Sequence, residues 1–293
     1  MALVAAILGF NMVALKFALI DSGPFTVQAL AAVAATSVFF TLAVAQGAPL
    51  RLERAQVPAA FGAGMALTVG SAVLVAAGVE RVSAGVASLL MSMTPVITLV
   101  LSALLLGERT NLAGILGIAA GFAGVGVVAF TADRTVAAEL LGVIFMLMGA
   151  GAWSSGIIIM RRFAAGIVPS TFVAYQTLFG IPVLFVLAYL IEGFVFEWSV
   201  VFVLAVLYAG VFSKGTSFFL QLRIVRLGTA TTASLTAFLL PVFGTLAGVI
   251  VLGETVRGGQ VVGGLIILMG VGLVLRSRED GGVPTPLPRT PAA

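Results

Sequence analysis

The chain lacks cysteine and histidine, and only 9% of its 293 residues are charged. Without cysteine no disulfide can form, and without either residue a metal site built on thiolate or imidazole ligands is excluded. Enzymes that depend on a histidine base or a cysteine nucleophile are excluded for the same reason. We therefore expect no metal and no other cofactor.

The charged fraction is far below the roughly 25% of an average soluble domain. In its place the chain has 61% hydrophobic residues and a mean hydropathy of +1.22. Composition therefore predicts an integral membrane protein. Because the apolar runs are continuous rather than alternating, we expect an all-α fold and not a barrel. A crossing needs about 20 apolar residues, and ten predicted helices meet that need, at 2–20, 24–45, 57–79, 83–106, 111–131, 139–160, 169–191, 198–222, 228–252 and 258–276.

The positive charges predict how these helices are oriented. A net charge of +4 could indicate nucleic-acid binding, but no basic cluster with interleaved aromatics occurs, so we expect no nucleic-acid partner. Arginine in cytoplasmic loops explains the charge better. With both termini cytoplasmic, as in a multi-pass protein of a bacterial-type inner membrane, three arginines fall outside (Arg81, Arg134 and Arg257). Ten fall inside: Arg51, Arg54, Arg109, Arg161, Arg162, Arg223, Arg226, Arg276, Arg278 and Arg289.

The second half of the chain repeats the first at a spacing of 146 residues. The repeat divides the chain into 1–132 and 133–276, with a proline-rich tail at 277–293 that we expect to be disordered and cytoplasmic. Five helices per half is an odd number, so the halves are predicted to cross the membrane in opposite directions. Such inverted repeats are typical of transporters; a duplicated scaffold without transport is the alternative. The matches are Ser88, Leu89, Pro95, Val96, Leu106, Gly107 and Glu108 with Ser234, Leu235, Pro241, Val242, Leu252, Gly253 and Glu254, and, more loosely, Lys16-Phe17 with Arg162-Phe163.

These features resemble the drug/metabolite transporter superfamily, and specifically its ten-helix EamA-type members. The resemblance rests on the duplication, on a fourth helix in each half that ends in LLLGE or VLGE, and on the proline 13 residues before that glutamate. Within the family the chain looks most like YddG-type exporters of amino acids. The resemblance implies that helices 1–4 and 6–9 surround a central cavity. Family members often carry a tryptophan in the first helix of each half; here Trp153 matches, whereas the first half has Phe10-Asn11.

Two proline-bearing helices are predicted to line that cavity. Ser88, Ser92 and Pro95 share one face of the helix at 83–106. Ser234, Phe238 and Pro241 occupy the matching face of the helix at 228–252. Each proline frees a backbone carbonyl that protein or cavity water must satisfy. The alternative is a plain kink, with serine hydroxyls bonded to their own helix.

Other candidates for the cavity are the few polar and aromatic residues inside helices. Asn11 and Trp153 lie in the first helix of each half, and Tyr175 and Tyr208 lie in the seventh and eighth helices. An interfacial anchor is the alternative for Trp153. The glycine steps at 117/121 and 259/263 predict close helix packing within a monomer, with a dimer surface as the alternative.

Lys214 is the deepest cation in the predicted membrane region. Its charge would cost roughly 2.5–3.5 kcal/mol in hydrocarbon, and Ser217 shares its helical face. We therefore predict that Lys214 faces a wet cavity and attracts a substrate carboxylate. The alternatives are partial snorkelling or bonding to backbone carbonyls. Lys16, which lies five residues before Asp21, is expected to snorkel to the outer interface.

The sequence thus predicts a secondary transporter that exports small metabolites, such as aromatic or other neutral amino acids, by alternating access in the lipid bilayer. Drugs, nucleotide sugars or sugar phosphates are alternative substrates, and a channel is the alternative of a different class. A membrane enzyme is not expected, since no buried acid–base pair is visible. No phosphate-binding loop occurs, so ATP is not expected to drive transport.

Overall fold

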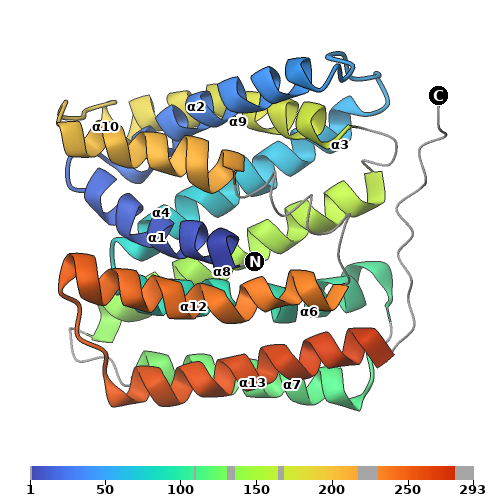
Figure 1. Ribbon diagram of the computed structural model, residues 1–293, viewed down its shortest axis with the longest axis vertical. Helices are drawn as coiled ribbons and strands as arrows, with labels where there is room; N and C mark the ends of the chain where they lie inside the picture. Colours follow the sequence, from blue (N-terminus) through green and yellow to red (C-terminus); the bar gives the residue numbers. More distant parts are fainter. Residues whose placement is uncertain (1, 109, 131–135, 164–167, 217–229, 281–293) are drawn as a thin grey trace.

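The computed structural model describes residues 2–108, 110–130, 136–163, 168–216 and 230–280, which form helices joined by short loops (Figure 1). The described residues contain no strand, only an isolated β-bridge between Ser22 and Phe196. The helices are α1 (Ala2–Ala18), α2 (Pro24–Ala45), α3 (Val57–Ala63), η1 (Gly64–Ser71), α4 (Ala72–Val79), α5 (Ala84–Met91), α6 (Thr94–Leu106), α7 (Leu112–Phe130), α8 (Val136–Phe163), α9 (Pro169–Glu192), α10 (Val200–Leu207), η2 (Tyr208–Thr216), α12 (Ala230–Leu252) and α13 (Gly258–Asp280).

Seven helical segments of the described chain are long and apolar enough to cross a membrane. Three further apolar helices are shorter, at Ala2–Ala18, Val200–Gly215 and Ala237–Leu252. All ten coincide with predicted helices, although ten complete crossings stay a prediction. The ends differ by a few residues, since α8 already begins at Val136 and α13 continues to Asp280, inside the predicted tail. The rest of that tail lies outside the described residues.

The fourth predicted helix is interrupted just before Pro95, as its proline predicts. A turn at Ser92 and Met93 separates α5 from α6, and Pro95 lies in the first turn of α6. Proline has no N–H to donate to the carbonyl four residues earlier, which is that of Met91. The Thr94 hydroxyl donates to this carbonyl instead, at 2.6 Å. Pro241, by contrast, lies within a continuous α12.

Two membrane segments contain a π-helical stretch. In the third, η1 lies between α3 and α4; in the eighth, η2 follows α10 directly. The two stretches overlap at the repeat spacing, since Gly64, the first residue of η1, and Gly210, the third residue of η2, are 146 residues apart. π-helical turns are rare and frequently occur at functional sites. The pair therefore directs attention to the faces of η1 and η2.

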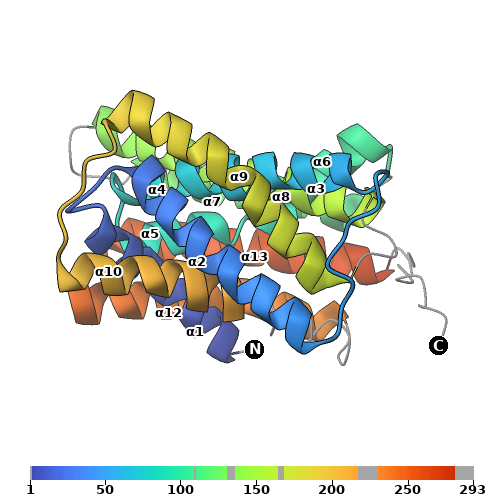
Figure 2. The same ribbon diagram turned by 90° about the horizontal axis from the view of Figure 1, so that it is seen from above.

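The helices pack as antiparallel partners from the two halves. α7 and α13 form one outer layer, and α2 and α9 lie together on the opposite side of the bundle (Figures 1 and 2). A Cβ on Gly117 would lie 2.7 Å from the Gly270 carbonyl oxygen, and one on Gly124 would lie 2.7 Å from that of Gly263. Only glycine allows this approach. The glycines of α7 thus pack against α13 of the same chain.

The main apolar core lies between these layers, and the outer surface is apolar as well. Leu90, Met93 and Ile267 are fully buried in the main cluster. Leu104 and Ile250 are nevertheless 75% and 76% exposed on the outside of the bundle. Large apolar side chains exposed in such numbers indicate a surface that faces lipid rather than water.

Candidate functional site

A partly buried lysine and a buried glutamine meet where η2 packs against α2. The Lys214 ammonium donates a hydrogen bond of 2.7 Å to Gln28 Oε1. Gln28 is only 2% exposed. A buried amide and a partly buried ammonium each lose hydrogen bonds to water, so the bond offsets part of both losses. The Lys214–Gln28 pair is the centre of the candidate site.

Gln28 was not among the predicted site residues. It is the one amide side chain within α2, an alanine-rich helix, and this is the signal by which the sequence could have indicated it. Its partner lies 186 residues away in sequence, and no local pattern connects two positions so far apart.

The charge of Lys214 is not neutralised by a carboxylate among the described residues. The two ion pairs there are Lys16–Glu254 and Arg81–Glu80, both at helix ends. The stretch 217–229 contains no Asp or Glu in its sequence. Charges shielded from water normally have a partner of opposite sign, so a lysine whose partner among the described residues is a neutral amide is suited to an incoming anion.

Aromatic and polar groups of α1 lie beside η2. The Tyr208 hydroxyl donates to the Ile7 carbonyl oxygen at 3.0 Å. Its ring meets Phe10 edge-on, with centroids 5.1 Å apart, and stacks on Phe212 at 5.6 Å. Asn11 Oδ1 is buried and accepts no hydrogen bond from the described residues. Lys214 and Tyr208 thus share one π-helical segment, and α1 and α2 both pack against it.

The predicted serines use their hydroxyls locally. Ser88 Oγ donates to the Gly85 carbonyl oxygen at 2.8 Å, and Ser92 Oγ donates to that of Leu89 at 2.6 Å. Both residues are buried. This is the arrangement that the kink interpretation anticipated. Their lining of a cavity stays a prediction, as does that of Ser234, whose side chain lies outside the described part, and of Ser217, which lies wholly outside it.

Trp153 and Tyr175 belong to a second apolar cluster. Both pack, partly buried, against the cluster that contains Phe39 and Phe172. The Tyr175 hydroxyl donates to the Leu50 carbonyl oxygen at 2.9 Å, which ties α9 to the loop after α2. Tyr175 is therefore bonded to a loop at one end of the bundle. Lys214, by contrast, is bonded to a residue within helix α2.

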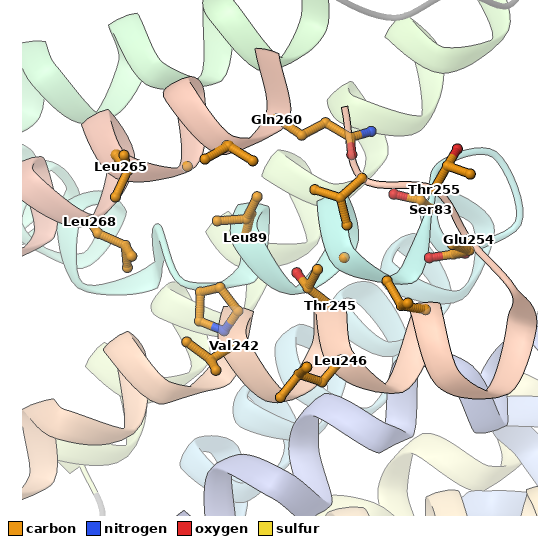
Figure 3. Close-up of a pocket in the computed structure, with 16 residues that line it drawn as sticks. Ser83, Leu89, Val242, Thr245, Leu246, Glu254, Thr255, Gln260, Leu265 and Leu268 are labelled. Atoms are coloured by element: carbon orange, nitrogen blue, oxygen red, sulfur yellow. The ribbon is translucent and has the colours of Figure 1, made fainter. Parts of the chain in front are cut away.

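A pocket of about 310 Å³ opens between α5, α12 and α13 (Figure 3). Its walls are mainly apolar, with Leu89, Val242 and Leu265 among them, and Pro241 also lines it. Phe238 contacts the neighbouring α13 at Gly272. Lys214 and Gln28 are not among the residues that line this pocket.

Lys16 forms an ion pair with a carboxylate beyond the end of α12, and its predicted snorkelling to the outer interface stays a prediction. Its ammonium lies 3.0 Å from Glu254 Oε1. Both carboxylate oxygens of Glu254 also accept from the Ala84 backbone N–H, at 2.9 Å each. Glu192 has a similar role at α2, where it accepts from the backbone N–H groups of Phe25 and Thr26, both at 2.8 Å. Negative charge at a helix N-terminus is stabilising.

Long apolar helices with an apolar exterior define the class of the molecule as a multi-pass, all-α membrane protein. The chain belongs to the EamA-like transporter family, which it matches twice, over residues 1–130 and again over residues 140–276.

Relatives agree with this assignment. The chain is 27% identical to a WAT1-related chloroplastic protein of Arabidopsis thaliana over 91% of its own length and 66% of the relative's. It is also 27% identical to the uncharacterized transporter YvbV of Bacillus subtilis (strain 168), over 67% of its length and 65% of YvbV. The chain thus spans just under two thirds of these relatives. One solved crystal structure has the same fold, with a TM-score of 0.68 at 23% identity, over 95% of this chain and 97% of that one.

Proposed function

We propose that the protein is a secondary transporter that moves a small, carboxylate-bearing metabolite through a bundle of two inverted repeats. Its family supports transport. The observation that carries the substrate class is the Lys214–Gln28 pair, in which a partly buried ammonium has a neutral hydrogen-bond partner. A substrate carboxylate would supply the missing negative charge.

Reciprocal contacts between the halves support the inverted repeat. Gly117 approaches Gly270, and Gly124 approaches Gly263. The two contacts are related by the repeat: Gly117 corresponds to Gly263, and Gly270 corresponds to Gly124, each at a spacing of 146 residues. Gly64 against the Gln176 carbonyl and Gly210 against the Ala31 carbonyl form another such pair, with the partners 145 residues apart. A pseudo-twofold axis between the halves accounts for both exchanges.

Neutral amino acids, aromatic ones included, fit the candidate site best. Lys214 would bind the carboxylate, and Asn11, whose buried amide oxygen accepts no hydrogen bond from the described residues, could accept one from an ammonium group. The rings of Phe10, Tyr208 and Phe212 offer an apolar surface for a side chain. We infer export or exchange down a gradient, at an inner membrane with both termini cytoplasmic. Phosphorylated substrates would need more than one deep cation, and Lys214 alone is predicted to have that place.

The test is counterflow in proteoliposomes. Purified protein is reconstituted with unlabelled solute inside, and labelled aromatic, branched and small amino acids, a cationic drug and a sugar phosphate are offered outside in turn. We expect exchange of amino acids that is accelerated by substrate on the opposite side. Equal flux without such acceleration would indicate a channel, and exchange of the drug or the sugar phosphate alone would contradict the proposed substrate class.

A further inference from the structure

At one end of the bundle, Glu254 connects three helices that are distant in sequence. It follows Gly253 at the end of α12, forms an ion pair with Lys16 of α1 at 3.0 Å, and accepts from the Ala84 N–H at the start of α5. Both charged side chains are largely shielded, at 24% and 17% exposure. Figure 3 shows Glu254 next to Ser83, the residue that precedes α5. We call this group, Lys16, Glu254 and the Ala84 N–H, the first latch.

At the opposite end of the bundle, α6 ends with the same backbone conformation as α12, but the glutamate that follows is exposed instead of paired. Gly107 and Gly253 both end their helices in the left-handed conformation, with φ of 67° and 65°. The next residue then donates its N–H back into the helix, Glu108 to Ser102 at 3.4 Å and Glu254 to Gly248 at 3.1 Å. Each of these residues is 146 positions from its counterpart. The Glu108 side chain is exposed, and no described residue donates to its carboxylate.

The other members of the first latch also have counterparts in the sequence. Lys16 corresponds to Arg162, so the positive charge is retained. Ser83-Ala84 corresponds in sequence to Thr229-Ala230, and Ala230 is the first described residue of α12. The charge pair of the first latch is therefore repeated in the sequence, together with a hydroxyl residue followed by alanine.

We propose that Glu108, Arg162 and the start of α12 form a second latch, and that the two latches engage alternately. In the described state the first latch is closed and Glu108 is exposed. When the first latch opens, Glu254 leaves the Ala84 N–H and Lys16, and Glu108 takes the equivalent place at the other end. This inference rests on the proposed alternating access, and it adds the residues that hold each end closed.

The test uses the natural absence of cysteine, because spin labels can be placed without removing native thiols. One label pair is placed at Ile20 and Val256, near the first latch; a second is placed at Leu105 and Phe163, near the second latch. All four side chains are exposed, and none belongs to a latch. Distances are measured by pulsed electron resonance on purified protein without substrate.

We expect Glu254→Gln to lengthen the first distance and to raise the population of the short second distance at least threefold. Lys16→Met should shift both distances in the same directions but less, because it leaves the carboxylate on the Ala84 N–H. The matched control is Glu197→Gln, which removes an exposed carboxylate between α9 and α10, and it should change neither distance.

Glu108→Gln should do the opposite and raise the population of the short first distance. If Glu254→Gln leaves the first distance unchanged, or opens that end without narrowing the other, the latches are not coupled and the inference is wrong. Wild-type counterflow tests the proposed function separately. Counterflow with unresponsive distances refutes only the latches, and responsive distances without counterflow refute only the transport proposal.

Discussion

The two π-helical stretches have the same backbone setting and different chemistry. In η1, Gly64 lies so close to α9 that a Cβ would be 2.5 Å from the Gln176 carbonyl oxygen. In η2, a Cβ on Gly210 would be 2.6 Å from the Ala31 carbonyl oxygen of α2. Yet the position of Lys214 in η2 corresponds, at the spacing of 146 residues, to Thr68 in η1, a buried and uncharged residue whose hydroxyl donates to the Gln176 carbonyl oxygen at 3.4 Å.

The comparison shows which features the two halves share and which they do not. The close approach of each π-helical stretch to its neighbouring helix depends on backbone atoms and a glycine, and it occurs in both halves. The charged group occurs once, so a symmetric frame contains an asymmetric site. Substitutions that exchange features of η1 and η2 therefore test which part is structural and which part binds substrate.

The largest effect is expected for Val69→Lys, which places a lysine in η1 next to Thr68, the counterpart of Lys214. The new ammonium would enter the apolar cluster that includes Ala29, Ala32 and Leu184. We expect the free energy of unfolding to fall by roughly 2.5–3.5 kcal/mol, which is the cost of placing a charge within the membrane. The folded yield in detergent, relative to Val69→Met, measures it. A normal yield would show that η1 faces water as η2 is proposed to do.

Gln28→Leu should have the next largest effect, because it removes the described partner of the Lys214 ammonium. Hydrogen bonds to charged groups contribute roughly 1.5–3 kcal/mol. Thermal unfolding should therefore occur at a lower temperature, and an added carboxylate substrate should restore more stability than it gives the wild type. Gln28→Asn is the conservative comparison. Unchanged unfolding of Gln28→Leu would mean that Lys214 has another partner.

Gly64→Ala and Gly210→Ala should destabilise the bundle to similar degrees. Each new methyl group would meet a backbone carbonyl that cannot move aside without shifting a helix. Overpacking of this kind costs roughly 1–3 kcal/mol. Gly151→Ala is the control, since nothing lies within 4 Å of a Cβ there. If only one of the two variants is destabilised, η1 and η2 are not structural equivalents.

Thr36→Val should have the smallest effect. It removes the buried hydrogen bond of 2.8 Å from Thr36 to Thr177, between α2 and α9. The loss should be about 1 kcal/mol, visible as a small shift in thermal unfolding, with counterflow unchanged. Ser37→Ala on the exposed neighbouring turn is the control. A strong transport defect in Thr36→Val would indicate that this helix pair moves during the cycle.

Much of the fold could be predicted from the sequence because lipid imposes a simple rule. Each of the ten predicted segments coincides with a helix in the described part of the chain, and Pro95 marked the break between α5 and α6. The glycines of α7 indicated close helix packing, which the structure places against α13. The π-helical stretches could not be predicted, since their apolar pattern is nearly that of an α-helix over two turns.

Less of the candidate site could be predicted, because its partners are joined only by folding. Lys214 was singled out by its cost in a membrane, but Gln28 lies 186 residues away. Lys16 has a plausible route to the interface in sequence, and only the fold brings Glu254 to it. Ser88 and Ser92 share a face, as predicted. Whether their hydroxyls bond to a substrate or to carbonyls of their own helix cannot be read from the spacing of the residues.

The most direct test of the central claim compares an amino acid with the amine that lacks its carboxylate. Counterflow of both is measured in proteoliposomes with wild-type protein, Lys214→Met and Val69→Met. We predict that wild type and Val69→Met exchange the amino acid at least tenfold faster than the amine, and that Lys214→Met loses this preference. A wild type that exchanges both equally, or a preference that survives in Lys214→Met, would contradict the assignment of Lys214 to the substrate carboxylate.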